Sequence, residues 1–249
     1  VRHVYHTDHD VTKVALSNDG KYLAMVVSVD GFGEFRIMDT ATGRFVAAPM
    51  PPRGFIYTYA GMQWSPVGHK LLFTFSSGSR PSGLWVLDLD ADAVYALTDA
   101  EVSADIKDRL AEPEAHSYTS FDGLRISYLF YKANDNPNNP TMIQIHGGPE
   151  SQEFPMYDPL VQYLVGQGFN IVAPNIRGSI GYGKTFHHLD DVEKRMDSIR
   201  DIECLAHHLL DTGKVKAGKL GIMGGSYGGF ATLCAIANFP ELWSAAIDI

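Results

Sequence analysis

Residues 219–229, KLGIMGGSYGG, place Ser226 in a glycine-rich turn between a short apolar run and a helix-forming segment. The run 219–223 predicts a buried strand, and 227–239 predicts a helix that ends before Pro240. In the pattern G-x-S-x-G the chain reverses so sharply that the serine is strained, and Gly224 and Gly228 leave room where a Cβ would collide. Such a turn exposes the serine hydroxyl and aims the first N–H groups of the helix at a developing oxyanion.

Ser226 is therefore the candidate catalytic nucleophile, the alternative being a structural glycine-rich turn. In an α/β-hydrolase the acid and then the histidine follow the serine along the chain. All ten histidines precede Ser226, and only the carboxylates Glu241 and Asp248 follow it. We expect this chain, which starts at Val1 and stops at Ile249, to be an internal fragment that lacks the catalytic acid and histidine. The chain alone is then expected to be inactive.

Composition excludes several classes of protein. The formal net charge of -9 argues against nucleic acid as a partner, because phosphate binding needs a basic patch. No apolar run reaches the roughly 18–20 residues that span a bilayer, so no membrane partner is expected. The two cysteines, Cys204 and Cys234, fall among apolar residues of predicted helices and are expected to be buried thiols, which excludes a disulfide scaffold.

The first 99 residues have a pattern of alternating apolar and polar residues in short pieces. Three candidate strands, 11–16, 22–27 and 34–38, are separated by turn residues such as Asp30-Gly31. The same order recurs about 48 residues later in 61–65, 70–75 and 84–88. A four-stranded unit repeated at this period indicates β-propeller blades, and a plain antiparallel sandwich is the alternative.

The organisation changes after a charged stretch that contains Pro113. We predict partial propeller blades over 1–99, a linker over 100–116 and the N-terminal part of an α/β-hydrolase domain over 117–249. The predicted strands are 124–131, 141–145, 170–173, 219–223 and 243–249. The predicted helices are 157–166, 192–210 and 227–238. Alternating strands and helices indicate an α/β fold with a largely parallel sheet. The long helix has an apolar stripe at Met196, Ile199, Ile202, Leu205, Leu209 and Leu210.

A second glycine-rich loop, residues 146–149 (HGGP), directly follows the strand 141–145. Glycines let backbone N–H groups approach a substrate oxygen, and the second oxyanion donor of this fold comes from such a loop. The predicted oxyanion hole is the Tyr227 N–H together with an N–H at Gly148. His146 is interpreted as a hydrogen-bonded structural residue, with a catalytic role as the alternative.

A third loop, residues 175–183 (NIRGSIGYG), places Arg177 among small residues. Its guanidinium could bind a carboxylate through two hydrogen bonds, or it could hold the loop in place, which is the preferred interpretation. Asp197 and Asp201, four residues apart on one helix face, are its candidate partners. The substrate-binding residues remain unknown from the sequence.

No cofactor and no metal site are expected. His3, His6 and His9 recur every third residue, but beside Asp8 and Asp10 they are interpreted as solvated. The adjacent pairs His187-His188 and His207-His208 are expected to point in different directions, as neighbours on a helix do.

Taken together, HGGP, NIRGSIGYG, the segment 195–198 and GGSYGG, in this order after blade-like repeats, resemble the prolyl oligopeptidase family of serine peptidases, in particular its acylaminoacyl-peptidase-like branch. The resemblance implies a propeller that covers an α/β-hydrolase domain, a short peptide as substrate, Ser226 as nucleophile, and Tyr227 and Gly148 as oxyanion donors. In the dipeptidyl-peptidase branch a tyrosine occupies the position of His146, so the sequence departs from that branch.

Two other functions remain open. One is a carboxylic-ester hydrolase on the same fold, because a serine nucleophile does not distinguish esters from amides. The other is a non-catalytic interaction protein that kept the scaffold. The sequence does not determine the residue preference at the cleaved bond, exo- or endopeptidase action, the cellular location or the oligomeric state.

Overall fold

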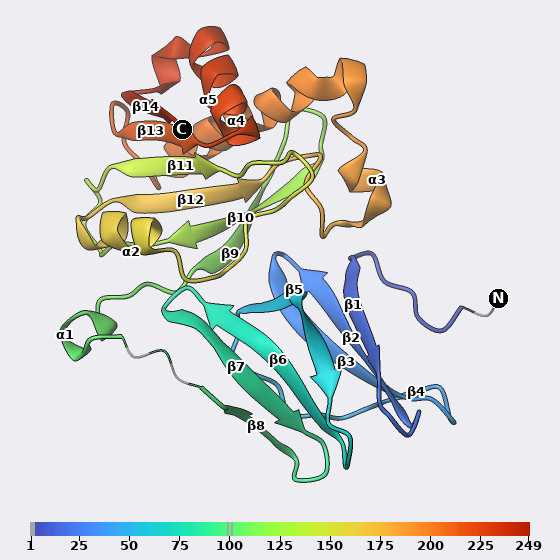
Figure 1. Ribbon diagram of the computed structural model, residues 1–249. Helices are drawn as coiled ribbons and strands as arrows, with labels where there is room; N and C mark the ends of the chain where they lie inside the picture. The colour runs from blue at the N-terminus through green and yellow to red at the C-terminus, as the bar shows by residue number, and fades with distance from the viewer. Residues whose placement is uncertain (1–2, 99, 101) are drawn as a thin grey trace. The chain divides into compact units, whose positions relative to one another are not determined.

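The computed structural model describes residues 3–98, 100 and 102–249, which form two compact units (Figure 1). The first unit ends at Asp108 and also includes the short segment Phe154–Tyr157. The second unit comprises Arg109–Glu153 and Asp158–Ile249. Within the described residues no helix is long and apolar enough to span a membrane.

The first sheet of the first unit is antiparallel, with its strands in chain order. Its strands are β1 (Val11–Leu16), β2 (Tyr22–Val29), β3 (Phe32–Asp39) and β4 (Arg44–Val46). Between β2 and β3 the chain turns through Asp30 and Gly31, both at positive φ (49° and 85°). This is the backbone of a type I′ hairpin, which Asp-Gly pairs favour, so the predicted turn is present.

The second sheet repeats the first, as the 48-residue period predicts. Its strands are β5 (Phe55–Trp64), β6 (Lys70–Ser77), β7 (Arg80–Asp88) and β8 (Ala93–Ala96), again antiparallel and in chain order. The rings of Phe35 and Phe73 meet edge to face at 4.9 Å, and the Trp64 indole N–H donates to Ala15 O at 3.0 Å. These contacts join the two sheets in one apolar core.

Several short elements of the chain were not predicted. The strands β4 and β8 have only three and four residues, too few to show alternation. The stretch predicted as a linker, 100–116, contains the helix α1 (Ala104–Lys107) and the start of β9 (Glu114–Thr119). The predicted linker therefore overlaps β9, an edge strand whose mostly polar residues show no clear alternation.

The sheet of the second unit has the order β14-β13-β11-β12-β10-β9. Besides β9, its strands are β10 (Arg125–Tyr131), β11 (Thr141–Ile145), β12 (Asn170–Asn175), β13 (Leu220–Gly224) and β14 (Ala245–Asp248). The four strands β12, β11, β13 and β14 run parallel, and β10 pairs antiparallel with β9 and β12. The predicted largely parallel sheet is therefore present.

The helices of the second unit follow the predicted order with one addition. They are α2 (Pro159–Gly166), α3 (Gly183–His187), α4 (Arg195–Asp211) and α5 (Tyr227–Asn238), with 3-10 turns η1 (Val192–Lys194) and η2 (Pro240–Leu242). The helix α2 begins two residues later than predicted, because Asp158 caps it by accepting from the N–H groups of Leu160 and Val161. The five-residue α3 was not predicted.

The core of this unit lies between the sheet and the helices α4 and α5 (Figure 1). Four residues of the predicted stripe of α4 are completely buried: Ile199, Ile202, Leu205 and Leu209. Met196, in the first turn, is 43% exposed, so the stripe begins one turn later than predicted.

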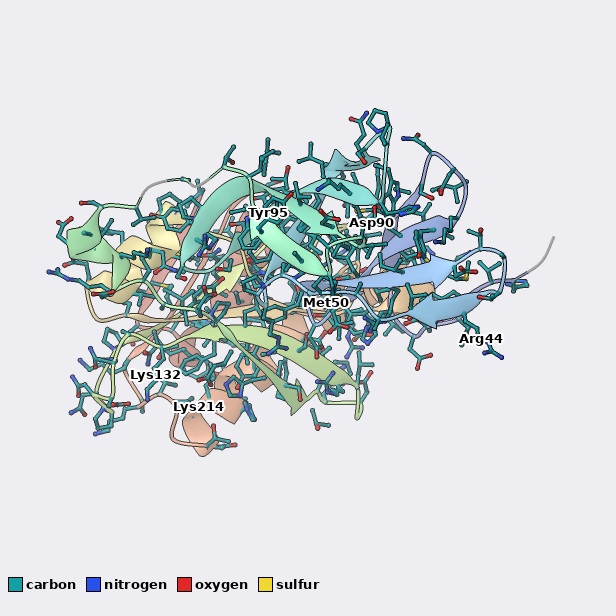
Figure 2. The ribbon with its side chains drawn as sticks, turned by 90° about the horizontal axis from the view of Figure 1, so that it is seen from below. Arg44, Met50, Asp90, Tyr95, Lys132 and Lys214 are labelled. Atoms are coloured by element: carbon teal, nitrogen blue, oxygen red, sulfur yellow. The ribbon has the colours of Figure 1, made fainter. Side chains whose placement is uncertain are left out.

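Cys204 and Cys234 are free thiols but only partly buried. Figure 2 shows Lys132 and Lys214 among the side chains of this unit, and Lys214 lies over the Phe130 ring at 5.0 Å.

Candidate active site

Ser226 lies at a strained turn between β13 and α5. Its backbone has φ 55° and ψ -120°, a combination that side chains other than glycine seldom adopt. A Cβ on Gly228 would lie 2.1 Å from Ile145 O, and one on Gly224 would lie 2.4 Å from the Gly228 carbonyl. Both positions therefore require glycine, as the sequence predicts.

The HGGP loop lies beside this serine, because β11 and β13 are neighbouring parallel strands and their carboxyl ends meet at one edge of the sheet. A Cβ on Gly147 would lie 3.5 Å from Ser226 Cβ and 3.9 Å from Ser226 Oγ. Gly148 has a φ of 130°, a value that in practice only glycine adopts. The structure thus brings the two predicted glycine-rich segments together.

The backbone N–H groups around Ser226 divide into those that are bonded and those that are free. The Ser226 N–H donates to Ile249 O at 3.0 Å, and the Gly228 N–H donates to Gly225 O at 2.8 Å. Within the described part of the chain, the N–H groups of Tyr227 and Gly148 have no acceptor. These two are the predicted oxyanion donors, and a polar ligand oxygen could bind to them.

The side chain of Tyr227 is held by α4. Its hydroxyl lies 3.1 Å from Ser198 Oγ and accepts from Arg195 Nη1 at 3.3 Å. Arg195 in turn pairs with buried Asp190, whose carboxylate lies 2.5 Å away. These bonds hold the side chain of the first residue of α5 against α4.

His146 is buried, and both of its ring nitrogens have partners. Nδ1 lies 2.7 Å from Gly147 O, and Nε2 lies 2.8 Å from Ser179 Oγ. Burial lowers the pKa of His146, although the bond to Gly147 O opposes this shift. The ring is therefore neutral near pH 7, with its hydrogen on Nδ1, because a carbonyl oxygen can only accept. The preferred interpretation of His146 as a hydrogen-bonded residue agrees with these contacts.

Arg177 is buried and holds its loop to the core. Its guanidinium forms two hydrogen bonds with Asp201, at 2.8 and 2.9 Å, and two with Asp122, at 2.9 and 3.0 Å. Burial lowers the pKa of Arg177, but the hydrogen bonds to Asp201 and Asp122 outweigh it and raise that pKa. Asp197, the other predicted partner, lies 4.0 Å away. Because four donors are already bound to carboxylates, Arg177 is not placed to bind a substrate carboxylate.

The histidine pairs and the N-terminal histidines form no common site. Contrary to expectation, the rings of His187 and His188 stack at 5.0 Å with an angle of 10°. The reason is that α3 ends at His187, so His188 does not continue the helical rotation. Among the residues that the structure describes, no group of three or more His, Cys, Asp or Glu side chains could hold a metal ion.

Two site residues were missed by the sequence analysis. Ser179, which contacts His146, sits 33 residues away in the loop after β12. Glu153, whose N–H donates to Asn175 Oδ1 at 2.6 Å, follows the HGGP loop. Neither residue has a local signal, because each acquires its partner only when β11 and β12 pair.

Comparison with known proteins shows which family the chain is similar to. The model of the prolyl oligopeptidase family matches residues 155–248, which include Ser226, so the predicted resemblance is confirmed. Dipeptidyl aminopeptidase BIII of Pseudoxanthomonas mexicana is 25% identical over 186 residues, which are 72% of this chain and 27% of that enzyme. Acylamino-acid-releasing enzyme 1 of Oryza sativa subsp. japonica is 30% identical over 129 residues, 50% of this chain and 16% of the enzyme. The chain thus spans about a quarter or less of these relatives.

Solved structures share the fold over nearly the whole chain. A puromycin-hydrolysing peptidase of Mycobacterium tuberculosis superposes with a TM-score of 0.86 at 21% identity, covering 98% of this chain and 39% of its own. Prolyl oligopeptidase B of Galerina marginata gives a TM-score of 0.84 at 20% identity, covering 97% and 34%. The predicted fold class, propeller blades followed by a partial α/β-hydrolase fold, is confirmed.

Proposed function

We propose that this chain carries the nucleophile of a serine peptidase that cleaves short peptides through an acyl-enzyme on Ser226. The observation that carries the proposal is the strained backbone of Ser226 beside two free N–H groups, those of Tyr227 and Gly148. Attack by Ser226 Oγ on a carbonyl carbon places negative charge on the carbonyl oxygen, and two backbone donors stabilise it. The related enzymes named above are a dipeptidyl aminopeptidase and an acylamino-acid-releasing enzyme, which supports a peptidase.

The proposal does not place the general base among residues 1–249. Both nitrogens of His146 are bonded to neighbours, and within the described residues no histidine bonds to Ser226 Oγ. A positioned general base contributes roughly 10²–10⁴-fold to such a reaction. We therefore expect the chain alone to show no turnover above background, and the experiments below use the full-length protein.

The first test replaces the nucleophile. A fluorophosphonate probe should label the full-length protein, and Ser226→Ala should abolish labelling, because the turn exposes this hydroxyl beside the oxyanion donors. The matched control is Ser244→Ala, at an exposed serine of the same unit, which should label normally. Unchanged labelling of Ser226→Ala would refute the assignment. Turnover of ester but not amide substrates would instead support the carboxylic-ester hydrolase.

The second test displaces one of the two proposed oxyanion donors, the Gly148 N–H. A Cβ at Gly148 would lie 2.7 Å from Glu150 N, so Gly148→Val must displace the loop. We expect kcat to fall about 10²–10³-fold with the fold nearly intact, the usual effect of losing one donor. Gly166→Val is the control, because its Cβ meets nothing within 4 Å. Full activity of folded Gly148→Val would place the second donor elsewhere.

A further inference from the structure

The strained backbone of Ser226 needs restraint from its surroundings. A residue with a side chain keeps a positive φ only where neighbouring groups prevent it from relaxing. Backbone bonds supply part of this restraint, since the Ser226 N–H donates to Ile249 O and the Gly228 N–H to Gly225 O. The N–H of Tyr227 has no acceptor within the described residues, so it does not hold this residue. The side chain of Tyr227 does, because it is bonded from outside α5.

The hydroxyl of Tyr227 is both a donor and an acceptor. Ser198 Oγ donates to Arg195 O at 2.7 Å, which uses the single hydrogen of that serine. In the 3.1 Å contact between Ser198 Oγ and the Tyr227 hydroxyl, the tyrosine is therefore the donor. The same hydroxyl accepts from Arg195 Nη1 at 3.3 Å. Both partners lie in the first turn of α4, so one short segment of that helix holds this hydroxyl.

The guanidinium of Arg195 joins the tyrosine to a buried carboxylate. Each Nη nitrogen of an arginine carries two hydrogens. Arg195 Nη1 donates one to Asp190 at 2.5 Å and the other to the Tyr227 hydroxyl. The guanidinium also lies over the tyrosine ring, with 5.2 Å between Arg195 Cζ and the ring centroid. The planar group therefore contacts both the hydroxyl and the ring of Tyr227.

Asp190 is a fixed anchor for this guanidinium. It is 2% exposed, and a Cβ on Gly178 would lie 2.3 Å from its carboxyl carbon. The carboxylate therefore packs against the backbone of the loop 175–183, whose Gly178 N–H donates to Phe186 O at 3.2 Å. A chain of contacts thus runs from this loop through Asp190 and Arg195 to the residue that follows the nucleophile.

We propose that Arg195 is a positioning residue, which holds the strained turn at Ser226 by bonding the Tyr227 hydroxyl, while Asp190 holds the guanidinium. The proposal rests on the proposed function, because it assigns a role in presenting the same nucleophile. It gives Arg195 no proton transfer and no contact with the substrate. When the bond to the hydroxyl is lost, Tyr227 is free to shift as the strain at Ser226 relaxes. A small misplacement of a reacting group lowers the rate of the chemical step.

The experiment removes each end of the Arg195–Tyr227 bond in the full-length protein. Tyr227→Phe removes the hydroxyl and keeps both the ring and the ion pair of Asp190 with Arg195. Arg195→Met is made together with Asp190→Asn, so that no buried charge is left unpaired. We expect Tyr227→Phe and this paired variant each to lower kcat by about three- to tenfold with KM within about twofold, because the nucleophile is misplaced and substrate binding is kept.

A double-mutant cycle tests whether Arg195 acts through the hydroxyl. In Tyr227→Phe the bond is already absent, so adding the paired variant should lower kcat by less than about twofold more. Independent effects would instead multiply, to about 10–10²-fold. The matched control is Asp197→Asn with Arg200→Met, an exposed pair on the same helix, which should leave kcat unchanged in either background.

Two further measurements distinguish positioning from a purely structural role. All variants are measured on aminoacyl and N-acylated peptide p-nitroanilides, and the rate of fluorophosphonate labelling is followed on the same preparations. Labelling requires the nucleophile but not release of a product, so its rate should fall in parallel with kcat. A purely structural role would lower the temperature of thermal unfolding and leave the labelling rate of the folded protein unchanged.

The outcomes separate the two proposals. If Ser226→Ala keeps activity, the proposed function fails. If Ser226→Ala is inactive but Tyr227→Phe or the paired variant keeps wild-type kcat, or if their effects multiply, the positioning role of Arg195 is refuted. If the paired variant does not fold, Tyr227→Phe decides, and a wild-type kcat and labelling rate in that variant overturn the proposal.

Discussion

The two units each contain a basic side chain held between two carboxylates, but in different surroundings. In the first unit His69 lies 2.7 Å from Asp90 and 3.0 Å from Asp19, whose side chains are 55% and 52% exposed. Figure 2 shows Asp90, in the turn between β7 and β8. In the second unit Arg177 is 3% and Asp201 0% exposed. Both clusters join segments that are far apart in the sequence, so sequence separation does not distinguish one cluster from the other.

The difference shows that burial, not the number of ion pairs, decides what such a cluster does. Exposed charges are already well solvated, so pairing them contributes little to stability. Removing one partner of a buried pair leaves an unsolvated charge and strongly destabilises the protein. The cluster at Arg177 therefore holds the fold around the site, whereas the cluster at His69 adjusts stability with pH.

The largest expected effect comes from breaking the buried cluster. Arg177→Met should lower the free energy of unfolding of the second unit by about 3–5 kcal/mol, because Asp201 is left buried and unpaired. Denaturant unfolding, with hydrogen exchange of the strand β10 as a local readout, measures it. The control is Arg36→Met, which breaks a half-exposed pair with Glu34 at 2.7 Å and should cost less than about 1 kcal/mol. Equal effects of the two variants would contradict the comparison.

A second prediction concerns the carboxyl of Glu153, a partly buried residue. Burial and then the charge of Asp158 raise the pKa of Glu153 to about 8, from an ordinary value of 4.5. The native state thus keeps a proton that the unfolded chain releases. The contribution of Glu153 to the free energy of unfolding is therefore fully present below pH 4.5, and it is lost as the pH rises to 8. The loss should reach up to about 1.4 kcal/mol per pH unit.

Gln144 opposes this shift, but by less than burial raises the pKa of Glu153. The amide of Gln144 bonds to the Glu153 carboxyl, and within the described residues Gln144 Oε1 is buried without a partner. A glutamine at position 153 has no acidic proton to release in this pH range. Glu153→Gln should therefore flatten the pH dependence of unfolding between pH 5 and 8, which equilibrium denaturation at several pH values would measure. Glu241→Gln, at an exposed carboxylate, should keep the wild-type slope, and an unchanged slope in Glu153→Gln would disprove the assignment.

The smallest expected effect is at the exposed cluster. Hydrogen bonds to Asp90 and then Asp19 raise the pKa of His69 above 6.5, while the bond to His69 lowers the pKa of Asp90. The contribution of His69 to the free energy of unfolding is fully present below pH 6.5, and it disappears as the pH rises through the raised pKa of His69. Hydrogen exchange of β2 and β6 should therefore quicken as the pH rises above 6.5, after correction for the intrinsic rate. His69→Gln should remove this change, and a change that persists would assign it to another group.

The sequence allowed the segment around Ser226 to be predicted nearly residue by residue. Glycines on both sides of a serine, between an apolar strand and a helix, indicate a strained turn, in which a Cβ on Gly224 would collide with the nearby Gly228 carbonyl. The helix α5 begins at Tyr227 as predicted for that reason. The hairpin turn at Asp30-Gly31 was predictable in the same way, because positive φ values are a local property.

The order of strands and the pairing of polar side chains were decided by the tertiary structure. The strand β11 lies between β12 and β13, which places the HGGP loop against Ser226, although the two are about 80 residues apart. The sequence indicated Asp197 and Asp201 as candidate partners of Arg177. Asp122, 55 residues before Arg177, is also a partner, but no feature of the sequence indicates it. Likewise nothing in the sequence links His146 to Ser179. Backbone sterics act between neighbours and can be read from the chain, whereas burial and hydrogen bonding between distant residues exist only after the sheet has formed.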